Sequence, residues 1–467
     1  MATANLTTLD ALLKEHVIDE VIESLNNEVD VFRLFEKGSF SWRGRLVRIA
    51  IHVARNSGVH FSGNGTLPTA GVQGWEHMEV LAERLYGRGE IDGEAIEAFG
   101  DDDSVIDDTE AEMNMLKKDV KNASNRAMVS GGTVIGFMYE QNALSVAGAP
   151  DDWLFDGDFD RINDLLAIAA PLEIRLIRFS DKLVHPGGAT SPVLAAGQGI
   201  SAADKAAGTI TLDEGLNTSA GVGAGDWGAA ATLEAGDVYA VEIIGPAVVM
   251  SDVNQVGLNH ESLGVYSNLG LVAPFGISAA TAGGFESMQA TGFSTLAIPA
   301  GAPAAPAGVR LPLDLADHLQ ECRDRIFDKA GEEVDCWLTS VKQRSKYVAL
   351  SVGTIQTDFT NRGKPGGLDQ GFAIDGNKQM SGGGGLGFGG TPVYVSRHVA
   401  SGHWIGLKRD SWRVAERGNR GMHFMQKDGA VLSRVQDRDA YEFTLKWYYN
   451  LVCVAPNCNG VIAGLEI

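Results

Sequence analysis

The sequence is short of cysteine and of positive charge, and each shortage excludes a class of protein. Its 467 residues include 38 Lys and Arg against 60 Asp and Glu, which gives a formal net charge of −22. A groove that holds nucleic-acid phosphates needs the opposite balance. The acidity favours solubility through surface repulsion, and it also suits a protein that encloses DNA without holding it tightly.

Four cysteines are too few for a disulfide framework in a chain of this length. We expect reduced thiols, as in a cytosolic setting, at all four positions: Cys322, Cys336, Cys453 and Cys458. No apolar run approaches the roughly 18 residues that a membrane span needs. Asp10, Lys14 and Glu15 interrupt the stretch where the apolar part of a signal peptide would lie. The sequence therefore predicts neither secretion nor contact with a membrane.

Motifs that carry catalytic or cofactor chemistry are missing. The sequence contains no G-x-S-x-G nucleophile elbow, P-loop, H-E-x-x-H or EF-hand pattern. Gly382–Gly390 matches G-x-G-x-x-G twice. The residues that follow, Thr391–Val395, predict a strand, whereas a dinucleotide site needs a helix there. We therefore expect no catalytic residue, no cofactor and no enzyme activity.

The last quarter of the chain holds one candidate metal set, in which His398 and His403 would join Cys453 and Cys458. The cysteine spacing occurs in zinc sites, but the histidines lack the helical context of a ligand pair. Two partly buried cysteines are the favoured interpretation, and we expect no metal ion.

Glycine is abundant, with 58 residues against 14 prolines, which favours a loop-rich architecture that contains strands. Alternating β-branched residues over Val47–Val53 predict a strand, and His77–Glu83 its antiparallel return. The outgoing limb is basic and the return limb acidic, through Arg43, Arg45, Arg48 and Arg55, then Glu76, Glu79 and Glu83. Opposite charges across such a ladder contribute about 0.2–1 kcal/mol per pair. Because a lone two-stranded ribbon is marginal in water, a neighbouring subunit is its natural support.

A long helix is predicted next. Thr109-x-x-Glu112 matches a capping box, and an apolar stripe follows it at helical spacing: Met113, Leu116, Val120, Ala123 and Ala127. Gly131 and Gly132 end the pattern. At 1.5 Å per residue this helix is about 35 Å long, enough for the axis of an elongated subunit.

The second half of the chain mixes helices and strands. Short apolar stretches over 170–250 predict strands, and the Pro/Ala/Gly segment 298–310 marks the best domain boundary. A second helix is predicted with Cys322 on its buried stripe and Gly331 at its end. Residues 361–391 predict one long glycine-rich loop.

Two stretches carry a resemblance to a known family. Leu85–Ile96 leads into the long helix, and the tail contains Val431–Asp437, Asp439–Glu442, Tyr448–Val452 and Gly460–Gly464. With the order of parts, they resemble the major capsid proteins of tailed double-stranded DNA bacteriophages. That fold is shared by encapsulins and by the floor of herpesvirus capsids. The order of elements is similar over the whole chain, whereas the sequence is closely similar only in short stretches.

The resemblance implies an α+β fold with an N-terminal arm, an extended β-hairpin loop, a peripheral domain with a long spine helix, and an axial domain. The parts would be the arm at 1–36, the extended loop at 37–90, the peripheral domain at 91–250, the axial domain at 251–404, and a C-terminal return to both domains at 405–467. The peripheral domain would contain the spine helix at 107–131 and, given its length, an inserted β sub-domain at 170–245.

In function, the resemblance implies a major capsid protein that self-assembles as hexamers and pentamers into an icosahedral shell around double-stranded DNA, without sequence-specific binding. A portal and a decoration protein would be its partners and, because the arm begins almost at Met1, the resemblance implies either a separate scaffolding protein or none. Assembly would take place in the host cytoplasm, and the product would be the capsid of the virion. Because no lysine lies between Lys37 and Lys117, we expect no covalent cross-link from a loop lysine.

Charged residues are the candidates for contacts between subunits, with the basic limb meeting acidic groups on a neighbour's spine helix. Seven residues are assigned to these contacts: Arg43, Arg45, Arg48, Glu79, Glu83, Glu110 and Glu112. Two other functions stay open at this point. One is an encapsulin-like shell that packages a cargo protein, and the other, from a different class, is a multidomain β-rich hydrolase.

Overall fold

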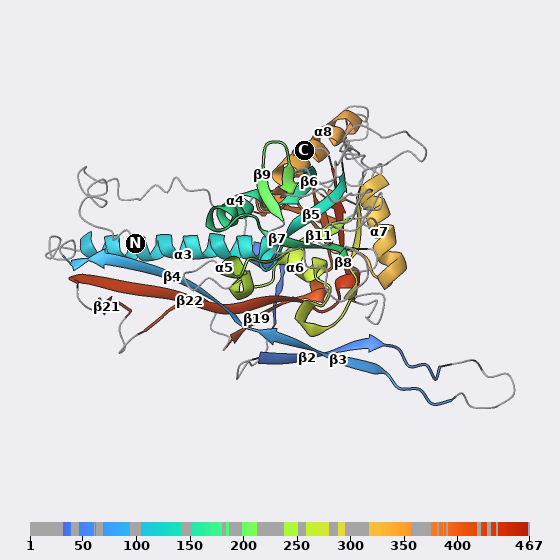
Figure 1. The fold of residues 1–467 in the computed structure, drawn as a ribbon, viewed down its shortest axis with the longest axis horizontal. Coiled ribbons are helices and arrows are strands. Elements are labelled where there is room, and N and C mark those ends of the chain that lie inside the picture. The colour runs from blue at the N-terminus through green and yellow to red at the C-terminus, as the bar shows by residue number, and fades with distance from the viewer. Residues whose placement is uncertain are drawn as a thin grey trace, which may run out of the picture.

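The computed structural model contains three large β-sheets, two two-stranded ones and the helices that pack on them (Figure 1). The predicted α+β class is confirmed. The structure describes residues 31–38, 46–59, 61, 69–93, 104–141, 151–179, 184–185, 199–212, 238–250, 258–279, 288–294, 317–355, 375–380, 383–385, 387–388, 391–417, 422–426, 431–435 and 438–465.

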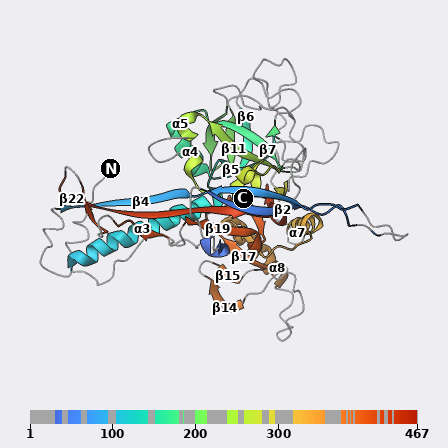
Figure 2. The same cartoon turned by 90° about the horizontal axis from the view of Figure 1, so that it is seen from below.

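The longest strands form a ribbon. In it, β4 (Glu83–Asp92) and β22 (Ala440–Cys453) pair antiparallel over ten residue pairs. Helix α3 (Ser104–Ser130) lies along this ribbon (Figures 1 and 2). Its 27 residues span about 40 Å. Four short strands complete the sheet: β1 (Glu36–Gly38), β19 (Trp412–Glu416), β20 (His423–Phe424) and β21 (Ser433–Arg434).

A glycine allows α3 to pack closely on β4. A Cβ atom added to Gly87 would lie 2.4 Å from Val120 Cγ2 and 3.1 Å from Leu116 Cδ1 of the helix. Because side chains alternate along a strand, the neighbours of Gly87 in β4 point to the other face of the ribbon. The ribbon therefore has one face covered by α3 and one outer face.

The two ends of α3 differ in how well the sequence predicted them. The C-terminal end is confirmed, since the helix stops before Gly131 and Gly132 takes a φ of +88°. The predicted start is wrong, because the helix begins at Ser104 and Thr109 lies inside it. With this start Asp107 lies in the first turn, where the positive helix end favours a carboxylate.

The second sheet has seven antiparallel strands in the order β8-β7-β11-β5-β6-β10-β9. A bridge between Leu172 and Ile200 brings the last strand of this order back beside the start of β7. Helices α4 (Phe159–Ile168) and α5 (Ala247–Met250) pack on it. The strands are β5 (Val134–Gln141), β6 (Asp151–Gly157), β7 (Glu173–Arg178), β8 (Val184–His185), β9 (Ile200–Asp204), β10 (Thr209–Leu212) and β11 (Tyr239–Gly245). Segment 170–245 thus supplies β7 to β11, and β5 and β6 complete the sheet.

The third sheet is mixed, with the order β12-β23-β18-β13-β17-β16. Its strands are β12 (Thr291–Ser294), β13 (Cys336–Thr339), β16 (Gly387–Phe388), β17 (Thr391–Val395), β18 (Trp404–Leu407) and β23 (Gly460–Ala463). Helix α7 (Asp317–Ala330) packs on β23, and α8 (Val341–Ile355) follows β13. The predictions for α7 are confirmed, because Cys322 is fully buried and Gly331, with a φ of +72°, follows its last residue.

Residues 361–391, predicted as one long loop, contain strands in their described part. β14 (Asp375–Met380) pairs with β15 (Gly383–Gly385), and β16 pairs with β17. A ladder is made by backbone groups, so the glycine-rich composition gave no periodicity that would reveal it. The strand predicted at Thr391–Val395 is confirmed.

One apolar core joins the three sheets. Phe137 of β5, Ile405 of β18 and Trp412 of β19 are all buried in it, together with Tyr266 of α6 (Val265–Gly270). Short 3-10 helices lie at its margins: η1 (Val31–Leu34), η2 (Leu258–His260), η3 (Pro274–Gly276), η5 (Arg409–Ser411) and η7 (Pro456–Cys458).

Candidate intersubunit surfaces

The predicted hairpin is confirmed as a separate two-stranded element. β2 (Leu46–Ala54) and β3 (Gly74–Leu81) pair antiparallel and project from the body on the side opposite to α3 and the ribbon (Figures 1 and 2). Beyond the strands the two limbs stay in contact, since a Cβ atom on Gly58 would lie 2.6 Å from the Gly71 nitrogen. The hairpin therefore extends past its ladder as a narrow double strand.

Among the described residues, the hairpin packs on its own chain at its base. Met78 and Val80 are fully buried there, in one cluster with Ile277 and Val452. The alternate residues of β3 are exposed, as the period of two in a strand requires.

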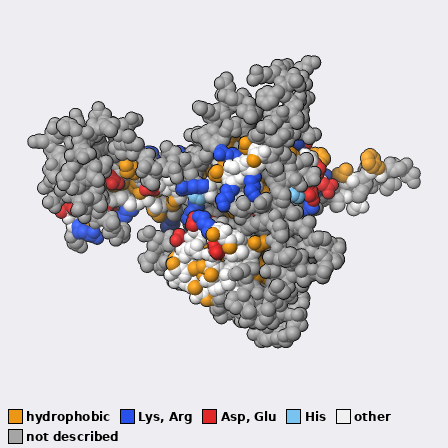
Figure 3. All heavy atoms as spheres, turned by 90° about the horizontal axis from the view of Figure 1, so that it is seen from above, with side chains coloured by type: hydrophobic (Ala, Val, Ile, Leu, Met, Phe, Trp, Pro, Cys, Tyr) orange, Lys and Arg blue, Asp and Glu red, His pale blue; other side chains and the backbone are white. Residues whose placement is uncertain are grey.

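Further out, the hairpin carries apolar side chains into solvent. Val59, Phe61, Val72 and Trp75 are 80%, 110%, 87% and 61% exposed. Figure 3 shows the hairpin at the right, with hydrophobic side chains in its outer part and acidic ones nearer the body. Exposed apolar groups concentrated on one projection mark a surface that another molecule covers.

The predicted contact residues differ in their positions and in their burial. Arg48 Nη2 lies 2.7 Å from Glu79 Oε1 across the hairpin, so the predicted pairing of the two limbs is present at this rung. Glu83 is half-buried at the start of β4, where burial raises its pKa against the opposing charges of His260 and Arg84. The other four lie as follows: Glu112 is half-buried on α3, while Arg43, Arg45 and the Glu110 side chain lie outside the described residues.

The outer face of the ribbon carries a second surface, which sequence reasoning missed. Arg84, Tyr86 and Arg88 are exposed there on β4. The Tyr86 hydroxyl lies 2.8 Å from that of Tyr448 on β22, with the rings edge to face. The Lys446 ammonium lies 5.9 Å from the Tyr448 ring centroid. The sequence signal for this surface was the Arg-x-Tyr-x-Arg alternation in β4. The surface itself forms only because β22 lies beside β4.

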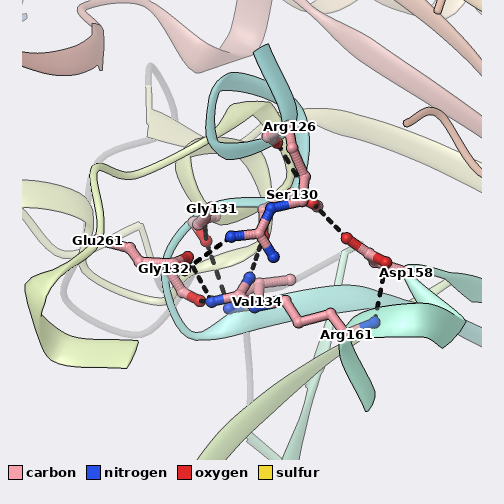
Figure 4. A network of polar contacts seen from close by, with 9 residues as sticks. Arg126, Ser130, Gly131, Gly132, Val134, Asp158, Arg161 and Glu261 are labelled. Carbon is pink, nitrogen blue, oxygen red and sulfur yellow. Dashed lines mark hydrogen bonds and ion pairs between the residues drawn. The ribbon is translucent and has the colours of Figure 1, made fainter. Parts of the chain in front are cut away.

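A third feature is a buried guanidinium where α3 meets the seven-stranded sheet (Figure 4). Arg161 of α4 has a side chain that is 4% exposed. It donates hydrogen bonds to the carbonyl oxygens of Ser130 and, at 2.9 Å, Gly132. It also donates to Glu261 Oε2 at 2.5 Å. Burial lowers the pKa of Arg161, and Glu261 opposes that shift.

Two further contacts extend this network. Glu261 Oε1 also pairs with Arg126 of α3 at 3.2 Å. Asp158 caps α4 by accepting a hydrogen bond from the Arg161 backbone nitrogen at 3.1 Å, and it accepts another from Ser130 Oγ at 2.9 Å. The same few side chains therefore supply hydrogen-bond partners to the end of α3 and to the start of α4.

The residues of the candidate metal set have separate structural roles. His403 is buried, with Nδ1 3.3 Å from the Tyr266 hydroxyl and Nε2 3.7 Å from Asp156 Oδ2. Cys453 is buried against Asn459. Within the described residues, no group of three or more His, Cys, Asp or Glu is placed to hold a metal ion. No helix in that part of the chain has the length and apolar character to cross a membrane.

Comparison by sequence finds no relative: no family model matches the chain, and no curated protein does. Comparison by structure finds matches over nearly the whole chain. A chain of the cyanophage A-1(L) capsid asymmetric unit aligns over 97% of this chain and 98% of its own, with a TM-score of 0.50 and 11% identity. The fold is that of a phage capsid protein.

Two further matches are chains from the capsid of a native GTA particle and from Mycobacterium phage Adephagia. The first has a TM-score of 0.45 and 8% identity and covers 98% of this chain and 96% of its own. The second has a TM-score of 0.39 and 12% identity and covers 100% and 99%. The phage capsid fold predicted from the sequence is confirmed, with the hairpin as its extended loop and α3 as its spine helix. The domain boundaries remain predictions, and residues 1–30 of the arm lie outside the described residues.

Proposed function

We propose that this chain is the major subunit of an icosahedral capsid shell, assembled from its hexamers and pentamers around double-stranded DNA. The observation that supports the proposal most directly is the extended hairpin. Its outer part exposes Phe61, Val72 and Trp75 and, in the part of the chain that the structure describes, its base packs on its own chain. Burying apolar surface contributes about 25 cal/mol per Å², so a second copy that covers the hairpin gains from each contact.

The outer face of the ribbon is the complementary surface on that second copy. The hairpin exposes Glu76 and Glu79 on β3 beside Trp75, and the ribbon exposes Arg84 and Arg88 on either side of Tyr86. A hairpin laid across a neighbour's ribbon would set acidic groups against basic ones and aromatic rings against each other. Such a contact joins two different surfaces, so repeating it builds a ring when the rotation between neighbours closes.

The contact predicted from the sequence is an alternative position for the hairpin, because α3 covers the face of the ribbon opposite to the outer one. Arg43, Arg45 and Arg48 would meet Glu110 or Glu112 of a neighbour's spine helix. For Arg48 this requires an exchange of partner, because it pairs with Glu79 of its own hairpin. That pair is exposed on both sides and contributes little, so the exchange costs little.

The charge of the chain suits a shell that encloses DNA. With a net charge of −22 it has no excess of cations for phosphates, and DNA inside such a shell would be confined by the wall. A scaffolding protein, a portal, a decoration protein and assembly in the host cytoplasm before incorporation into the virion complete the proposal. Shell stability would rest on non-covalent contacts, since no lysine lies between Lys37 and Lys117.

Particle size tests the proposal. The full chain, expressed alone, is examined by size-exclusion chromatography and negative-stain electron microscopy, where we expect shells, tubes or hexamer rings. A Phe61→Ser/Trp75→Ser variant should remain a folded monomer. Phe327→Ser is the matched control, because Phe327 is also exposed, at 55%, but lies on α7; this variant should assemble normally.

The outcomes separate the alternatives. A wild-type chain that stays a monomer or small dimer would contradict the shell and favour the β-rich hydrolase. Assembly that survives in the double variant but fails in the control would move the contact from the hairpin to α7. Particles from infected or native cells that hold a cargo protein in place of DNA would identify an encapsulin-like compartment.

A further inference from the structure

The contact in Figure 4 joins two parts of the subunit beside the apolar core that they share. Helix α3 and its ribbon form one elongated part, and the seven-stranded sheet with α4 forms another. The chain passes directly from α3 through Gly131 and Gly132 into β5. Two consecutive glycines are a connection with wide backbone freedom, so the angle between the parts depends on the core that they share and on a polar restraint at the junction.

Arg161 supplies that restraint through groups that would otherwise lack partners. The last carbonyl groups of a helix accept no hydrogen bond inside the helix. Arg161 donates to two carbonyl groups around the end of α3, those of Ser130 and Gly132. Its position favours it electrostatically, because the C-terminal helix end carries partial negative charge. Glu261 then pairs with both Arg161 and Arg126, which ties α3 and α4 to one carboxylate.

We propose that Arg161 fixes the orientation of the seven-stranded sheet relative to the spine helix, so that both move as one rigid body. The planar fork of arginine can hold two carbonyls and a carboxylate at once, whereas a lysine ammonium cannot match this geometry. A buried ion pair of this kind is weak evidence for stability but can specify one arrangement. This inference concerns the shape of the single subunit and goes beyond its role in a shell.

Hydrogen exchange measured by mass spectrometry on the unassembled full chain tests this inference. In Arg161→Met, the amides of residues 126–134 should exchange about tenfold faster or more, as expected for a local opening. Arg161→Lys keeps the charge and should show a smaller rise at the same amides. Arg323→Met is the matched control, because Arg323 of α7 pairs with Glu333 away from this contact, and it should leave residues 126–134 unchanged.

Two results would overturn the proposal. One is exchange at 126–134 that matches the wild type in both Arg161 variants. The other is a rise spread evenly over all three sheets, which would make Arg161 a general support of folding. If Arg161→Met does not fold, the lysine variant decides by the same criteria. Because the subunit is measured before assembly, the inference can hold even where no shell forms.

Discussion

Burial decides the reactivity of the cysteines, because a thiol reacts as its thiolate and desolvation disfavours that charge. Cys322, Cys336 and Cys453 are fully buried, and burial raises the pKa of each to about 12. Cys458 is half-buried, and burial raises its pKa as well. The sequence predicted thiols and their burial at Cys322, but the difference between Cys453 and Cys458 came from the fold.

At pH 8 we therefore expect a disulfide reagent such as DTNB to label Cys458 first in the folded subunit. The other three thiols should react only after denaturation, when all four become accessible. Absorbance of the released thiolate measures both phases. Cys458→Ser should remove the early phase, and rapid reaction of two or more thiols in the folded subunit would contradict this prediction.

Gly87 shows a packing constraint that acts on a single residue. Valine at this position would place its Cβ 2.4 Å from Val120 of α3, so the spine helix would have to shift. Overpacking of this kind costs about 1–3 kcal/mol. We therefore expect Gly87→Val to lower the free energy of unfolding, measured by urea denaturation, by that amount. Arg88→Val, on the outer face of the same strand, should cost less, because its ion pair with Glu442 is partly exposed. Equal losses in both variants would contradict the packing argument.

At the scale of elements, a charge change in the hairpin allows its effect on folding stability to be measured separately from its effect on assembly. The exposed Arg48–Glu79 pair should contribute little to folding, so Arg48→Glu should leave the melting temperature of the monomer nearly unchanged. If Arg48 contacts a neighbour, the same change should reduce the yield of particles in electron microscopy.

The charge swap Arg48→Glu/Glu79→Arg is the control for this prediction. It restores an opposite pair within the hairpin but places a carboxylate where a neighbour would meet the arginine. We expect assembly to stay impaired. Full recovery in the swap would show that the hairpin needs only its internal pair, and Arg48 would leave the set of contact residues.

Elements with local periodicity were predictable. The hairpin strands, the C-terminal end of α3 and the buried stripe of α7 follow from alternation, helical spacing and glycine stops within short segments. Errors arose where the deciding information was not local. The start of α3 lies before the capping box at Thr109, and β14 and β15 lie in a segment whose glycines show no pattern.

At the scale of the whole molecule, the net charge of −22 sets how subunits approach each other. Salt screens the repulsion between like-charged subunits beyond the Debye length, which is about 30 Å at 0.01 M salt and about 8 Å at 0.15 M. The proposed pairs between a hairpin and a neighbour's ribbon would act at contact and would be screened less. We therefore expect the rate of particle formation, followed by light scattering, to rise between these salt concentrations. A fall over this range would mean that long-range attraction governs encounter.

The sequence by itself determined the acidic balance, the hairpin with its charged limbs, the long helix and the order of parts that resembles a phage capsid protein. These features depend on residues close together in the chain. The tertiary structure alone decided the outer face of the ribbon, where Tyr86 meets Tyr448, and the contact of Arg161 with Glu261. The partners in these pairs are 362 and 100 residues apart. No local pattern specifies which distant groups will meet, because that depends on how the sheets pack around their common core.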